Sequence, residues 1–231
     1  MRITGGGRHR GRMTTLTAAT PHTHHASDAY RRLSTLLLGA GVIQLAGGAT
    51  TMALGGEYAS RTASTFLSAG WGVGWTLIAL ALLTMTRTSM AGERTGRRLP
   101  FIPFAGAVCY VAAEIWWVWN LTVGGRTAEA IEEDAAVALL PAGALLGAAG
   151  MVVTGVAVVR ARRWTGWRRF APLAAGLYPF VAMFGFVIVT GGPNLLAIVG
   201  WSLPWIAVGV AAAVEGQATR RRSSMARRRS A

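Results

Sequence analysis

The stretch FIPFAGAVCYVAAEIWWVWNLTV, residues 101–123, contains a single charged residue, Glu114. As an α-helix it would be about 35 Å long, enough to cross the roughly 30 Å hydrocarbon core of a bilayer. Five further apolar runs of similar length occur between clusters of charge, so six membrane-spanning helices are predicted, at residues 34–54, 66–85, 101–123, 135–159, 171–190 and 195–214. The sequence therefore predicts an all-α integral membrane protein built as a six-helix transmembrane bundle.

The composition also differs from that of a soluble domain. Only 14% of the 231 residues are charged and 52% are hydrophobic, whereas about 25% of a soluble chain is charged. The formal net charge of +14 is of the kind that nucleic-acid-binding proteins carry. However, the arginines lie at the ends of apolar runs, as beside a membrane. We therefore expect anionic lipid headgroups on the cytoplasmic side as partners, and no nucleic acid.

The distribution of arginine predicts the orientation of the helices. Twenty-one of the 23 arginines lie before the first predicted span, after the sixth, or in the loops after the second and fourth; the other loops contain only Arg61 and Arg126. Because loops rich in basic residues stay in the cytoplasm, both termini are predicted to be cytoplasmic. The chain has no lysine, which indicates a GC-rich bacterial genome. We expect a multi-pass protein of the bacterial inner (cell) membrane.

One membrane domain, residues 31–216, is predicted between two cytoplasmic tails. Residues 1–30 show no apolar periodicity and residues 217–231 contain six arginines, so both segments are expected to be disordered. All four histidines lie in the first tail, and the one cysteine, Cys109, lies within an apolar run. Since imidazole and thiolate are the usual ligands of haem, zinc and copper, we expect no metal site and no cofactor.

Small residues and prolines predict where helices pack closely or bend. Gly143 and Gly147 of the fourth span lie one turn apart in a helix of small residues, which favours close contact with its neighbours. Gly70 and Gly74 of the second span have the same spacing, although in so glycine-rich a chain it also arises by chance. Proline inside the fifth span, at Pro179, predicts a kink.

Two of the predicted hairpins share a motif. The second span contains GWGVGW at 70–75, and the sixth contains GWSLPW at 200–205, both at the predicted outer end. A repeat that relates spans one and two to spans five and six would produce this likeness, as in transporter folds. The preference of tryptophan for membrane interfaces would produce it equally well. On that second interpretation these tryptophans form an outer aromatic belt with Trp116, Trp117 and Trp119.

Glu114 is the one acidic residue inside the predicted spans. An ionised carboxylate near the bilayer centre costs about 3 kcal/mol, so Glu114 is expected to face the bundle interior or a wet cavity. Helical spacing places Tyr110 and Trp117 on its face, and Gln44 of the first span is a candidate hydrogen-bond partner. The candidate intramembrane polar site is therefore Glu114, Tyr110, Trp117 and Gln44. A proton- or cation-handling carboxylate and a structural hydrogen bond remain equal interpretations.

Three classes of function are compatible with a membrane bundle. An enzyme is not expected, because the spans lack histidine and paired acids and the loops show no nucleophile–base set. A non-catalytic accessory or regulatory protein, acting on a membrane-protein partner or as a homo-oligomer, is the first expectation, because one embedded charge is few for coupled transport. The alternative is a small secondary transporter or channel-like protein that uses Glu114.

Overall fold

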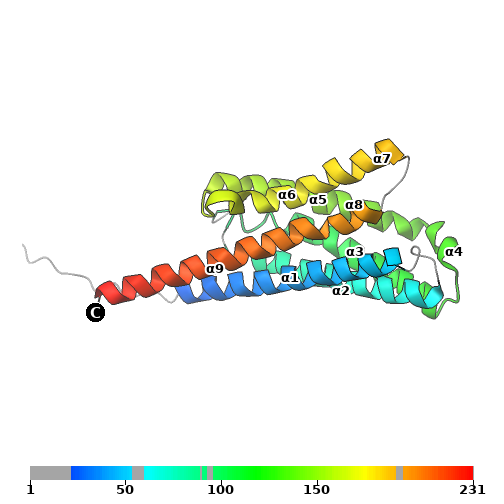
Figure 1. The fold of residues 1–231 in the computed structure, drawn as a ribbon, viewed down its shortest axis with the longest axis horizontal. Helices are drawn as coiled ribbons and strands as arrows, with labels where there is room; N and C mark the ends of the chain where they lie inside the picture. Colours follow the sequence, from blue (N-terminus) through cyan, green and yellow to red (C-terminus); the bar gives the residue numbers. More distant parts are fainter. Residues whose placement is uncertain (1–21, 54–59, 89, 93–95, 191–194, 231) are drawn as a thin grey trace, which may run out of the picture.

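The computed structural model describes residues 22–53, 60–88, 90–92, 96–190 and 195–230, and this part of the chain is helical without a strand (Figure 1). The elements are α1 (His22–Ala53), α2 (Arg61–Met85), α3 (Phe101–Thr122), α4 (Ala128–Glu132), η1 (Ala135–Ala138), α5 (Leu139–Ala161), η2 (Gly166–Phe170), α6 (Ala171–Tyr178), η3 (Pro179–Met183), α7 (Phe184–Thr190), α8 (Leu195–Gly200) and α9 (Ser202–Ser230). Five described segments are long and apolar enough to cross a membrane: Ser27–Ala53, Arg61–Met85, Phe101–Thr122, Ala135–Ala161 and Leu196–Arg222. The prediction of an all-helical membrane protein is confirmed to that extent.

The fifth predicted span, residues 171–190, is helical but interrupted. It consists of α6, the π-helical turn η3 and α7, none of which alone is long enough to cross a bilayer. The interruption begins at Pro179. Proline has no backbone N–H to donate, and its ring clashes with the carbonyl of the preceding helical turn. A single π turn accommodates such a break without ending the helix. The predicted kink is thus a change of helix type.

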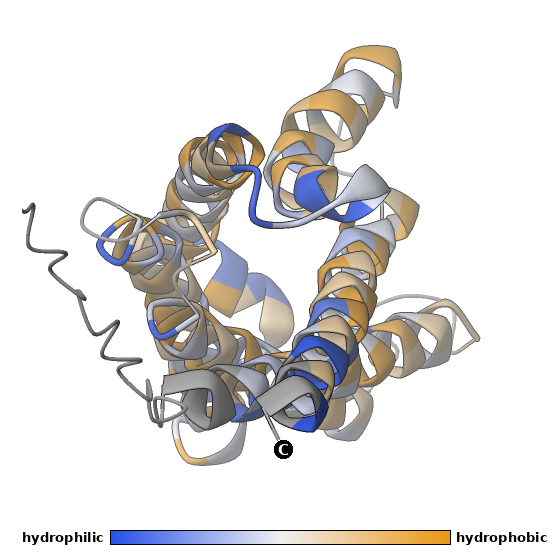
Figure 2. Ribbon diagram, turned by 90° about the vertical axis from the view of Figure 1, so that its left-hand side faces the viewer, coloured by the Kyte–Doolittle hydropathy of each residue, from blue (hydrophilic) through white to orange (hydrophobic). Residues whose placement is uncertain are grey.

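The long helices pack in chain order around a ring. α1 packs on α2, α2 on α3, α3 on α5, and α5 on α6. Short connections favour such antiparallel neighbours. α9 packs on both α6 and α1, so the last helix closes the bundle against the first, and the end view shows the helices arranged in a ring (Figure 2). In contrast, α7 packs mainly on η3 and diverges from the bundle (Figure 1).

Glycines permit the closest helix contacts. A Cβ atom on Gly106 of α3 would lie 2.5 Å from the backbone nitrogen of Gly147 and 2.7 Å from the carbonyl oxygen of Gly143, both in α5. The small-residue face predicted on the fourth span is therefore in backbone contact with α3. The two glycines of α2 differ from each other: a Cβ on Gly74 would meet the side chain of Gln44, whereas one on Gly70 would meet nothing within 4 Å.

Parts of both predicted tails are helical in the structure, and their disorder stays a prediction. α1 begins at His22, and Tyr30 is buried, while residues 1–21 and residues 191–194, between the fifth and sixth predicted spans, lie outside the described residues. α9 continues to Ser230. Residues 217–230 contain neither glycine nor proline and are rich in arginine, a good helix former, so nothing in that segment ends the helix.

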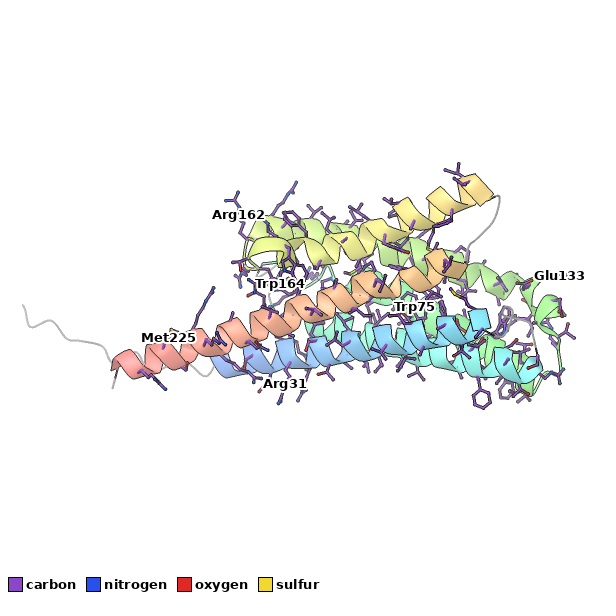
Figure 3. All side chains as sticks on the ribbon, in the orientation of Figure 1. Arg31, Trp75, Glu133, Arg162, Trp164 and Met225 are labelled. Carbon is purple, nitrogen blue, oxygen red and sulfur yellow. The ribbon has the colours of Figure 1, made fainter. Side chains whose placement is uncertain are left out.

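Charge is segregated between the two ends of the bundle. Arg31, Arg162 and Met225 lie at one end, which we call the basic end, and Glu133 lies at the opposite, acidic end, with Trp75 between them (Figure 3). The start of α1 and the end of α9 both lie at the basic end (Figure 1).

Candidate functional site

A cavity of about 560 Å³ lies inside the ring, in the half of the bundle nearer the acidic end. This volume falls in the range of small-molecule sites, about 300–1,000 Å³. Its wall comes from α1, α2, α3, α5, η3 and α8, with α4 and η1 at the acidic end. Most of the lining is aliphatic or aromatic; the polar lining residues are Thr51, Ser64, Ser68, Tyr110, Glu114 and Glu132.

Three of the four predicted site residues line this cavity. Tyr110, Glu114 and Trp117 project from one face of α3, as their spacing predicts. Gly72 of α2 makes room for Glu114, because a Cβ there would lie 3.3 Å from the Glu114 Cβ. The ring of Tyr110 stacks on Trp75 with 4.0 Å between centroids and 3° between planes, which fixes its position on the cavity wall. The role of these residues stays a prediction.

Gln44, the fourth predicted residue, is not part of the cavity lining. Its side chain is 3% exposed and lies beside Gly74 of α2 and Ser202 of α9. The Ser202 hydroxyl donates to the Gln44 Oε1 atom at 3.5 Å, and the Nε2 atom has no hydrogen-bond partner among the described residues. Gln44 therefore joins α1, α2 and α9 rather than contributing to the site around Glu114.

Tryptophans of the shared motif form a buried cluster, which corrects the expectation of an outer belt. Trp75, Trp201 and Trp205 are all buried; the ring centroids of Trp75 and Trp201 are 5.2 Å apart, edge to face. The Trp201 Nε1 atom donates to the Ala175 carbonyl at 3.0 Å. By contrast, Trp119 is 61% exposed. The signal for burial was the spacing of Trp75 with other apolar residues on one face of α2: Ile78 and Leu82, both buried.

The charge of the cavity is one-sided. Glu114 contributes a carboxylate from α3, and Glu132 of α4 contributes one at the acidic end. None of the described lining residues is basic. Trp71, Trp117 and Phe180 add aromatic rings to the wall. Carboxylates beside aromatic faces in an apolar cavity attract an organic cation both by charge and by cation–π contact.

The segment around α4, which carries Glu132, is held by Arg61 and Arg126 at the acidic end. Arg126 forms an ion pair with Asp134 at 2.8 Å and lies over the ring of Trp116. This Arg126 hydrogen bond, helped by the backbone N–H of Ala136, holds the pKa of the Asp134 carboxyl below its usual range. Arg61 donates to the Gly125 carbonyl at 3.0 Å. Across the described residues, no group of three or more potential ligands is placed to hold a metal ion.

Sequence reasoning missed a buried ion pair at the basic end. Glu215 of α9 is 5% exposed, and its Oε1 atom lies 3.1 Å from Arg168 Nη1 and accepts the Thr165 backbone N–H at 3.1 Å. Nearby, the buried Trp164 donates to the Tyr30 hydroxyl at 3.3 Å. The available signal was that Glu215 is an acid directly after an apolar span and among arginines. We call Glu215, Arg168 and Thr165 the basic-end latch.

Comparisons of the chain with protein-family models, with curated proteins and with solved structures found no match. The cavity and its residues are therefore the basis for a functional proposal.

Proposed function

We propose that this protein crosses the bacterial inner membrane six times, with both termini in the cytoplasm, and that its cavity binds an apolar organic cation. Residues 171–190 supply the additional crossing: 20 helical residues extend about 30 Å. An even number of crossings agrees with the start of α1 and the end of α9 at the same end of the bundle. The clustering of arginine at that end supports a cytoplasmic location.

The observation that carries the cation proposal is the position of Glu114 in the wall of an aromatic cavity whose described lining residues include no basic residue. Intramembrane acids usually act on ions or charged solutes, because their desolvation makes them costly to keep for structure alone. A proton or a bare metal ion needs far less than the 560 Å³ observed. The volume and the apolar wall instead match a drug-sized molecule whose charge is delocalised or shielded.

Movement of this cation across the membrane is the function that the broken helix supports best. Secondary transporters form their substrate sites beside discontinuous helices. Here η3 interrupts the helix of residues 171–190 and contributes Pro179, Phe180 and Met183 to the cavity wall. A small secondary transporter is therefore the preferred function, and no catalysis is proposed.

The second candidate is a non-catalytic accessory protein, and α7 is the observation that favours it. This helix diverges from the bundle, and its side chains Ile188 and Val189 are almost fully exposed. In place of lipid, a membrane-protein partner or a second copy of the chain would cover this apolar face of α7.

Binding of tetraphenylphosphonium to the purified protein in nanodiscs tests the cation proposal, with the isosteric anion tetraphenylborate as the comparison. We expect quenching of tryptophan fluorescence by the cation, and an affinity at least about tenfold weaker, or about 1.4 kcal/mol, in Glu114→Gln. The matched control is Glu133→Gln, which removes an exposed acid outside the cavity lining and should leave the affinity unchanged. Equal binding of anion and cation, or an unchanged Glu114→Gln, would contradict the proposal.

Uptake of the same cation into proteoliposomes then separates the two candidates. Transport predicts uptake faster than the passive entry into protein-free liposomes, an excess that Glu114→Gln abolishes and Glu133→Gln preserves. Cation binding without any such excess would favour the accessory candidate.

A further inference from the structure

A second hollow lies at the basic end of the bundle, between α1 and α2. It is a groove of about 480 Å³, remote from the cavity around Glu114. Arginines and leucines dominate its lining: Arg31, Arg32 and Leu36 from α1, Leu80 and Leu83 from α2, and Arg87 from the turn that follows α2. None of the functions considered above uses these residues.

The groove has an excess of positive charge. Three guanidinium groups border it, and none of its described lining residues is acidic. Asp28 lies 3.6 Å from Arg31, but both side chains are more than half exposed. Such a pair contributes little and is readily exchanged. Guanidinium groups bind phosphate oxygens through paired N–H donors, so three of them at one groove favour a phosphate.

The apolar residues are arranged by depth. Leu36 lies one turn deeper along α1 than Arg32. Leu83 and Leu80 lie in the last turns of α2, progressively deeper than Arg87, which follows the end of that helix. The threonines between them turn their hydroxyls to their own helices: Thr35 donates to the Arg31 carbonyl and Thr84 to the Leu80 carbonyl. The groove therefore offers charge at its outer rim and a hydrocarbon surface toward the membrane interior.

We propose that this groove is a binding site for one anionic phospholipid. The phosphate contacts Arg31, Arg32 and Arg87, and an acyl chain lies along Leu36, Leu80 and Leu83. A soluble phosphate would use the arginines but not the leucines. Basic pockets between membrane helices at the cytoplasmic side are recognised by anionic headgroups in this way. The site depends on the membrane placement proposed above and is independent of the cation site.

Native mass spectrometry of the purified protein tests this site, with phosphatidylglycerol and phosphatidylcholine of identical acyl chains. We expect a preference of at least about tenfold for phosphatidylglycerol. Replacing the three groove arginines by glutamine (Arg31→Gln, Arg32→Gln, Arg87→Gln) should abolish this preference. A matched triple variant at exposed arginines of the same end but outside the groove (Arg97→Gln, Arg98→Gln, Arg162→Gln) should retain it.

Three outcomes would overturn the proposal: no preference in the wild-type protein, an equal loss of preference in the control variant, or full displacement of the lipid by millimolar inorganic phosphate. The second outcome would indicate diffuse charge, and the third a soluble-phosphate site. A photoactivatable phosphatidylglycerol provides a measurement on the wild-type chain, so the conclusion does not depend on the variants folding. Cross-links should map to residues 31–36 and 80–87, and a map confined to other segments would contradict the site.

Discussion

At the scale of single residues, Glu215 and Arg168 illustrate how a buried charge connects distant segments. Glu215 belongs to α9, while Arg168 and Thr165 belong to the loop and 3-10 turn between α5 and α6. The Arg168 guanidinium also donates to two acceptors of Thr165, its backbone carbonyl oxygen and its hydroxyl oxygen. The Glu215 carboxylate therefore organises one charged side chain and one backbone donor at once.

Glu215→Ala should destabilise the protein by about 3 kcal/mol, since it leaves a largely buried guanidinium and a backbone N–H without their acceptor. The loss would be measured as a lower midpoint in unfolding by SDS titration from mixed micelles. Gln217→Ala, at an exposed position two residues further along α9, is the control and should change little. The double variant Glu215→Leu with Arg168→Leu should recover most of the loss, because removing both charges leaves neither unpaired. A Glu215→Ala protein as stable as the control would show that the latch is not structural.

The position of a site residue could be predicted from the sequence only where one physical effect, such as the desolvation of a charge, determined it. The desolvation of a carboxylate was enough to direct Glu114 inward, together with Tyr110 and Trp117 of its helix face. Gln44 carries no charge, so its partner depended on which helix lies opposite, and that helix is α9. Glu215 lies where an apolar span meets an arginine-rich segment, at the predicted edge of the membrane domain, and the sequence did not indicate that Arg168 and Thr165 of a distant loop would contact it.

At the scale of helices, the contact between α3 and α5 depends on Gly106. Gly106→Ala should destabilise the protein by about 2 kcal/mol, since its Cβ would overlap backbone atoms of α5 that have no freedom to rotate away. Because α3 carries Glu114, the variant should also weaken binding of tetraphenylphosphonium. Gly70→Ala in α2 is the matched control: nothing lies within 4 Å of its Cβ position, so a gain of about 0.5–1 kcal/mol in helix stability is expected. Thermal unfolding in detergent would measure both, and equal effects would exclude the close contact.

The predicted span boundaries depend on hydropathy, and hydropathy does not distinguish an α-helix from a π-helix. Residues 171–190 are uniformly apolar, so the sequence indicates one span, and Pro179 indicates a bend. Whether the bend becomes a kink or a π turn depends on how α5, α6 and α8 surround it, and η3 contacts all three. Trp119 is exposed, as expected of a tryptophan in an outer aromatic belt. Trp75 and Trp201 are instead buried and pack against each other inside the helix bundle.

At the scale of the whole molecule, the number of crossings is open to a direct test. In a Cys109→Ala background, single cysteines placed by Thr15→Cys, Glu129→Cys and Met225→Cys report the N-terminal segment, the acidic end and the C-terminal helix. A membrane-impermeant maleimide should label only Glu129→Cys in intact cells and all three after lysis, because six crossings leave both termini inside. Labelling of exactly one terminal cysteine in intact cells would instead mean an odd number of crossings.

Closure of the ring by α9 has a consequence for biosynthesis. The Ser202 hydroxyl that Gln44 accepts from is 158 residues further along the chain. At about 5–20 residues per second, the ribosome needs roughly 8–30 s to synthesise that interval. During this time Gln44 and Gly41 of α1, whose later neighbours are Ser202 and Ile206 of α9, are turned toward lipid or toward an insertion chaperone. A nascent chain that stops before α9 would keep this polar face uncovered, which is the kind of defect that membrane quality-control proteases select.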